Sequence, residues 1–105
     1  MVSAIYNAYT LAEYLKERCN GEEKAVRAVE LASTFSTDRR GIRDMVNFLR
    51  CSGEPICSGM SGYWYSDNPD DIERTIATMR AKITGIQKAI TGLKIAKENT
   101  GEIGG

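Results

Sequence analysis

The sequence has 105 residues, the length of one domain, and its 42% hydrophobic and 27% charged residues are typical of a folded soluble protein. Fourteen Lys and Arg balance fourteen Asp and Glu, which argues against coating nucleic acid or an anionic membrane through bulk charge alone. The chain contains no His, so the commonest general base and metal ligand is missing.

The three Cys residues and the start of the chain predict a cytoplasmic protein. An odd number of thiols cannot form a complete disulfide framework, and residues 1–6 lack the features of a signal peptide. No apolar run approaches the roughly 20 residues needed to cross a bilayer. Cys51 and Cys57, without His or a second Cys pair, do not make a zinc site. No nucleophile is paired with a base, so we expect neither an enzyme nor a cofactor.

Two helices are predicted in the first third of the chain. Thr10 and Glu13 have the spacing of a capping box, which predicts a helix over residues 10–19. A second helix is predicted over residues 22–33, because carboxylates lie in its first turn and small apolar residues follow at helical spacing. Residues 34–36 then form a predicted three-residue turn.

A third helix is predicted from a cap at Ser36 or Thr37 to about Arg50. Its apolar residues have the spacing of one buried stripe: Ile42, Met45, Val46 and Leu49. The opposite face, at about 100° per residue, collects Arg40, Arg43 and Asn47. Arg50 flanks this polar face.

Two short β-prone runs around residues 59–62 predict a β-hairpin. Alternation directs Tyr63 and Tyr65 to one face and Trp64 to the other, so one face is expected to stay partly exposed. These aromatic residues could stack on bases, but cross-strand packing is the favoured interpretation. Residues 51–71 carry four acidic side chains and no basic one.

The last helix, predicted over residues 69–97, has the clearest periodicity in the chain. Asp67 or Asn68 is its expected cap, and Pro69 its first residue. Apolar residues at alternating steps of four and three form a heptad seam: Ile72, Ile76, Met79, Ile83, Ile86, Ile90 and Leu93. Isoleucine at every a position favours a homodimer through this seam, although the helix could also pack on its own domain.

The order helix, short helix, tight turn, helix and hairpin is that of a winged helix-turn-helix. Several segments carry a closer similarity: Glu30-Leu31-Ala32-Ser33, residues 42–50, Gly53, Pro55-Ile56-Cys57-Ser58 and Gly62-Tyr63-Trp64-Tyr65. Over residues 22–66 the chain therefore resembles small winged-helix DNA-binding proteins of tailed phages and prophages. The family's wing often carries Lys or Arg, which the corresponding residues here lack.

The resemblance implies that the third helix enters the major groove of double-stranded DNA. The implied contact residues are Ser36, Thr37, Arg39, Arg40, Arg43, Asn47 and Arg50. Arg40, Arg43 and Asn47 would read bases, since arginine pairs with guanine and asparagine with adenine. The two hydroxyls, Arg39 and the first helical amides would hold the phosphate backbone.

The sequence as a whole predicts a mainly α fold with a small β-hairpin wing. A winged helix-turn-helix domain is expected over residues 1–68, a dimerisation helix over 69–98 and a flexible tail over 99–105. The expected function is sequence-specific DNA binding, as a small transcriptional regulator or origin-type binding protein of phage or prophage origin. The alternative is a module whose winged fold and Ile-rich helix dock on a host or phage protein, which the neutral charge and acidic wing favour.

Overall fold

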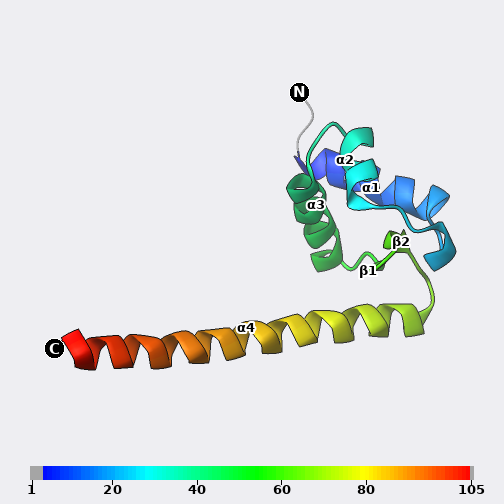
Figure 1. Cartoon of the computed structure of the whole chain (residues 1–105). Helices are drawn as coiled ribbons and strands as arrows, with labels where there is room; N and C mark the ends of the chain where they lie inside the picture. Colours follow the sequence, from blue (N-terminus) through cyan, green and yellow to red (C-terminus); the bar gives the residue numbers. More distant parts are fainter. Residues whose placement is uncertain (1–3, 105) are drawn as a thin grey trace. The chain divides into compact units, whose positions relative to one another are not determined.

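The computed structural model describes residues 4–104, and side chains from Ala8 to Gly101. The elements in chain order are α1 (Ala4–Arg18), the 3-10 helix η1 (Glu22–Lys24), α2 (Ala28–Thr34), α3 (Arg39–Cys51), β1 (Ile56–Gly59), β2 (Gly62–Tyr65) and α4 (Pro69–Gly104) (Figure 1). The predicted mainly helical fold with one hairpin and a long C-terminal helix is confirmed. The chain divides into two compact units between Thr75 and Ile76, so the first unit includes the first turns of α4.

The core of the first unit lies among α1, α2, α3 and the hairpin. The predicted stripe of α3 is buried, and α1 contributes its own apolar stripe to the same core: Ala8, Leu11, Ala12 and Leu15. Leu31, Ile56 and Tyr65 complete the contact from α2 and the strands. None of the helices formed by the described residues has the length and apolar content that a membrane span requires.

The first helix begins earlier than predicted. α1 already includes Ala4, so Thr10 lies inside the helix and the predicted capping box at Thr10 and Glu13 is wrong. The buried side chains of Ala8 and Leu11 continue the helical spacing toward the amino terminus. Packing of this longer stripe therefore stabilises helix upstream of the local capping signal.

The continuous helix predicted over residues 22–33 is also wrong. After η1 the chain is extended, and Val26 forms an antiparallel bridge with Tyr63 of β2. The Val26 amide donates to the Tyr63 carbonyl at 2.9 Å, and the Tyr63 amide donates back at 2.8 Å. These bonds satisfy backbone groups that a helix would have paired locally, so α2 begins only at Ala28.

The turn before α3 differs from its prediction in length and in its cap. It covers residues 35–38, and Ser36 adopts a left-handed conformation with φ of 54°. Asp38 is the N-cap, because its Oδ1 accepts a hydrogen bond from the Gly41 amide at 2.8 Å. The predicted cap at Ser36 or Thr37 is therefore wrong. A carboxylate one residue later takes this role, which suits the positive end of the helix dipole.

The predicted hairpin is confirmed, with Cys57 opposite Trp64 and a two-residue loop between the strands. Tyr65 faces the main core, and Trp64 faces the other side of the sheet. Tyr63, on the same face as Tyr65, is half-buried, so the expectation that one face stays partly exposed is confirmed there. The Trp64 face is closed, because Trp64 is only 2% exposed. The first turns of α4 contact this face, where the Trp64 indole donates to Asp71 at 3.4 Å and the Ser58 amide donates to Thr75.

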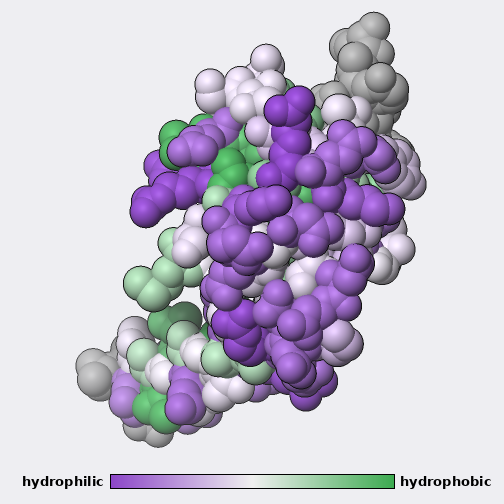
Figure 2. Space-filling model, turned by 90° about the vertical axis from the view of Figure 1, so that its right-hand side faces the viewer, coloured by the Kyte–Doolittle hydropathy of each residue, from purple (hydrophilic) through white to green (hydrophobic). Residues whose placement is uncertain are grey.

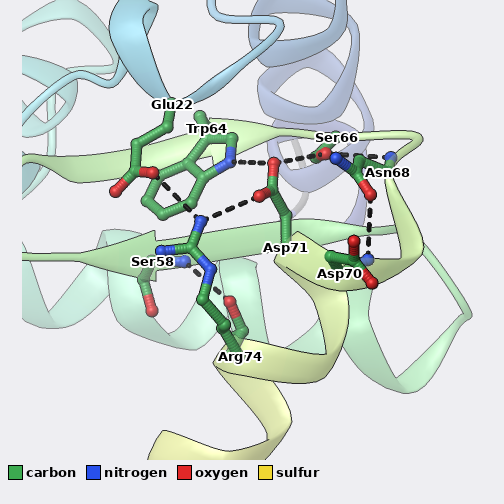
Figure 3. Close-up of polar contacts among 9 residues, drawn as sticks. Glu22, Ser58, Trp64, Ser66, Asn68, Asp70, Asp71 and Arg74 are labelled. Carbon is green, nitrogen blue, oxygen red and sulfur yellow. Dashed lines mark hydrogen bonds and ion pairs between the residues drawn. The ribbon is translucent and has the colours of Figure 1, made fainter.

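Asp71 organises the start of α4 (Figure 3). Besides Trp64, its carboxylate accepts hydrogen bonds from the Ser66 hydroxyl and from Arg74, both at 2.8 Å. Arg74 also forms an ion pair with Glu22 at 3.0 Å. The network thus links the hairpin, η1 and the first turn of α4.

The predicted start of α4 is confirmed at atomic detail. Pro69 is its first residue, and the Asn68 side chain accepts a hydrogen bond from the Asp70 amide at 2.9 Å. The helix continues to Gly104, beyond the predicted end near residue 97.

Two glycines with positive φ provide a test of the close approach between β2 and Val26. An added Cβ at Gly62 would collide with the Val26 carbonyl, whereas one at Gly53 meets nothing within 4 Å. We expect Gly53→Ala to cost about 1–2 kcal/mol of unfolding free energy from its φ alone. Gly62→Ala adds the collision, for a total of about 2–5 kcal/mol. Urea unfolding followed by Trp64 fluorescence measures both, and equal losses would contradict the predicted role of the close approach.

Asp71 also predicts an acid-sensitive stability. Hydrogen bonds from Arg74, then Ser66, hold the pKa of this carboxyl below its ordinary value of 3.8, although burial opposes them. Because the folded pKa is the lower one, the stabilisation is complete above the unfolded value and is lost as the pH falls through the folded value. We expect Asp71→Asn to destabilise the protein at neutral pH and to reduce its further loss in acid. Urea unfolding at about pH 7 and about pH 3 tests this, with Asp70→Asn as the exposed control.

Candidate nucleic-acid interface

The exposed face of α3 brings together three of the predicted DNA-contacting residues, and Arg39 is exposed to one side of them in the first turn. We call this face the recognition face; it consists of Arg40, Arg43 and Asn47, all exposed. The opposite side of the helix carries the four buried residues of the core stripe. Burial of that stripe fixes the rotation of α3 about its axis, so these side chains point into solvent as the periodicity predicted.

The recognition face is cationic but has an acidic and an aromatic border. Asp44, three residues before Asn47, is exposed beside this face. Further round lies Phe48, which is partly exposed and packs edge-to-face on Tyr9 of α1, with ring centroids 6.0 Å apart. The face can therefore donate several hydrogen bonds to acceptors, and its border offers apolar contact.

The amino-terminal end of α3 is already occupied by an anionic group of the protein itself. Ser36 and Thr37 are exposed immediately before the helix, as the predicted phosphate contact requires. The Asp38 carboxylate, however, accepts the Gly41 amide and lies at the positive helix end. A phosphate at the first helical amides would have to displace it. Arg39 is therefore a better placed phosphate donor than these amides.

Arg50 lies apart from the recognition face and joins α3 to the hairpin. Its Nε donates to the Ile56 carbonyl at 2.8 Å, and its Nη2 donates to the Ser58 hydroxyl at 3.0 Å. The side chain is half-buried, and this burial lowers the pKa of its guanidinium. These contacts give Arg50 a positioning role that the sequence alone did not indicate.

The hairpin offers few groups to a nucleic acid. Trp64 and Tyr65 are buried, and the Tyr65 hydroxyl donates to Glu54 at 3.1 Å, so neither ring is available for base stacking. Met60 at the loop is fully exposed and apolar. Ser61 beside it is an exposed hydroxyl, while Ser58 is engaged by Arg50.

Sequence reasoning missed two features next to α3. Arg27 is exposed at the N-cap position of α2, where a cation could contact a phosphate. It was hidden inside the helix predicted over residues 22–33. The Tyr9–Phe48 pair was missed because it joins two helices that are distant in the sequence. The available signal was the position of Phe48 outside the apolar stripe of α3, which indicates an exposed aromatic ring.

The thiols do not form a second site. Cys19 and Cys57 are buried, and burial raises the pKa of both thiols, which keeps them protonated and unreactive. Cys51 is exposed at the end of α3. Among the described residues, no group of three or more potential ligands could hold a metal ion.

Comparisons with known proteins add no identification. A scan against family models, a search of curated proteins and a search of solved structures each found no match. The face of the molecule in Figure 2 is covered mainly by hydrophilic residues, with hydrophobic ones in small separate groups. What the protein binds therefore has to be inferred from the chemistry of its exposed side chains.

The contacts of Arg50 predict that arginines of the same helix differ in their effect on stability. Arg50→Met removes two charge-assisted hydrogen bonds to the hairpin, and we expect a loss of about 1.5–3 kcal/mol. Arg43→Met changes an exposed side chain and should stay within about 0.5 kcal/mol. Chemical unfolding of the two variants checks this difference. Equal stabilities would show that the Arg50 contacts contribute nothing net.

Proposed function

We propose that the protein binds double-stranded DNA in a sequence-specific manner, with α3 inserted in the major groove. The observation that carries this proposal is the recognition face, which aligns two guanidinium groups and one carboxamide on a helix whose opposite side is buried in the core. The major groove is wide enough for an α-helix and presents base acceptors at its floor. No other exposed element among the described residues combines these groups in this way.

Each side chain of the recognition face has a proposed role. Arg40 and Arg43 pair with guanine O6 and N7, and Asn47 pairs with adenine N6 and N7. Arg39, beside this face, contacts a phosphate. Ser36 and Thr37, in the turn just before the helix, contact the same backbone. Arg27 at the start of α2 is a second cation suited to the backbone.

The element order supports a winged helix-turn-helix interpretation of the first unit. α2 and α3 are joined by a short turn, and a two-stranded hairpin follows α3 directly. This order agrees with the resemblance to phage and prophage winged-helix proteins. We therefore propose a small cytoplasmic regulator or origin-type binding factor of that kind.

The charge distribution predicts how such binding should respond to salt. The wing contributes no basic side chain, so phosphate contacts are limited to the few cations near α2 and α3. About three such contacts give a slope of about −3 in log affinity against log salt. Direct base contacts then carry a larger share of the affinity than in a strongly basic protein.

Fluorescence anisotropy with labelled duplexes tests the proposal. A pool of random duplexes first yields preferred sites by selection, and binding to these is then measured across a salt series. We expect Arg40→Ala/Arg43→Ala to weaken specific binding at least about tenfold, since each bidentate contact is worth about 1–3 kcal/mol. The matched control, Lys16→Ala/Lys24→Ala, removes two exposed charges elsewhere and should bind nearly as the wild type does.

Two outcomes would overturn the proposal: no binding at low salt, or equal losses in both double variants. Either result would favour the second candidate function, a protein-interaction module. The specific observation behind that candidate is the exposed aromatic pair of Tyr9 and Phe48 beside α3. A partially exposed aromatic pair is typical of protein interfaces.

A further inference from the structure

α4 carries an apolar seam whose residues from Ile83 to Leu93 are exposed. The helix has 36 residues and rises about 54 Å. Every described side chain from Ala77 to Gly101 is exposed, including the seam residues Met79, Ile83, Ile86, Ile90 and Leu93. Ile83 is 55% and Leu93 70% exposed. Large apolar residues gathered on one stripe of a helix are normally covered by a partner.

The spacing of the seam specifies what kind of partner fits. Ile76, Ile83 and Ile90 repeat every seven residues, with Met79, Ile86 and Leu93 between them at steps of three and four. This 3.5-residue period keeps the stripe facing one neighbour only when that neighbour is a helix of the same period. A second copy of α4 supplies that period by definition.

We propose that two copies of this chain pair through α4 in an antiparallel coiled coil. In the register where Ile83 faces Ile86 of the partner subunit, Met79 faces the partner's Ile90. Ile76 then faces the partner's Leu93, and the two-fold axis repeats the three contacts. Every layer between residues 76 and 93 is thus filled by two apolar side chains.

The charges along α4 favour this antiparallel direction. At its start the acidic residues Asp70, Asp71 and Glu73 outnumber the single basic residue Arg74. In its later turns five basic residues outnumber Glu98 and Glu102: Arg80, Lys82, Lys88, Lys94 and Lys97. The antiparallel register puts Glu73 beside Lys94 of the partner subunit, both at e positions, and opposes the two helix dipoles. A parallel pair would instead face Lys97 with the partner's Lys97 at an a position and leave Glu73 without a cation. The Glu73–Lys94 pair occurs twice by symmetry and contributes little by itself, but it sets the direction together with the opposed dipoles and the avoided Lys97–Lys97 contact.

The oligomeric state of the full chain tests the pairing, by sedimentation equilibrium. The wild type should show twice the 11.6 kDa of one chain. Ile83→Glu, in the seam, should shift the mass to one chain. The matched control is Ile95→Glu, because Ile95 is equally exposed at 55% but occupies an f position away from the seam. It should remain a dimer, and Trp64 fluorescence verifies that the first unit stays folded in both variants.

Cross-linking tests the direction. In a Cys51→Ser background the two remaining thiols are buried, so only an introduced cysteine reacts. A mixture of Glu73→Cys and Lys94→Cys chains should form a mixed cross-link with a short bis-maleimide. Lys97→Cys alone should not, because its two copies lie about 37 Å apart in the antiparallel register.

A monomeric wild type, a larger assembly, or an Ile95→Glu variant that dissociates as readily as Ile83→Glu would overturn the pairing. An efficient Lys97→Cys cross-link would overturn the antiparallel direction. The proposal does not depend on DNA binding, since the Arg40→Ala/Arg43→Ala variant should remain a dimer. Failure of either proposal is therefore distinguishable from failure of the other.

Discussion

Strand β2 is the element on which the first unit depends, because it is hydrogen-bonded along both edges and carries a buried side chain on each face. One edge pairs with β1. The other receives the chain between α1 and α2: the Tyr65 amide donates to Cys19, the Gly21 amide donates to Tyr65, and Val26 pairs with Tyr63. Tyr65 enters the core on one face, while Trp64 meets the start of α4 on the other. A two-stranded hairpin alone is marginally stable, so this enclosure is what makes the hairpin a fixed support.

From that support the position of the recognition face follows in two steps. The Val26 bridge sets where α2 begins, and α2 leads through a short turn into α3. At the far end of α3, Arg50 ties the helix to β1. Both ends of α3 are thus linked to the hairpin, the first through α2 and the second through Arg50, while Arg40 and Arg43 remain exposed. This backing lowers the entropic cost of the DNA binding that we propose, because the helix backbone is already ordered.

Features set by local rules could be predicted, and features set by distant partners could not. The buried stripe of α3, the hairpin and the Asn68–Pro69 helix start all follow from periodicity, alternation and capping within a few residues. The break at Val26 depends on hydrogen bonds to Tyr63. The burial of Trp64 depends on the start of α4, which is joined to the hairpin by the Trp64–Asp71 and Ser58–Thr75 hydrogen bonds. The same division holds in the candidate site. Arg40, Arg43 and Asn47 share a face through helix geometry alone, whereas the contacts of Arg50 require the hairpin in place.

The zero net charge of the chain conceals charge separation that serves two different surfaces. Guanidinium groups gather on α3, where few carboxylates neutralise them, and the acidic residues 51–71 carry no cation. Along α4 the acidic start and basic later turns are complementary to each other only when a second helix runs in the opposite direction. A uniform mixture of the same residues would have the same net charge and would favour neither an anionic ligand nor a particular helix direction. The arrangement of charge, rather than its total, is therefore what both the proposed DNA binding and the proposed pairing of α4 depend on.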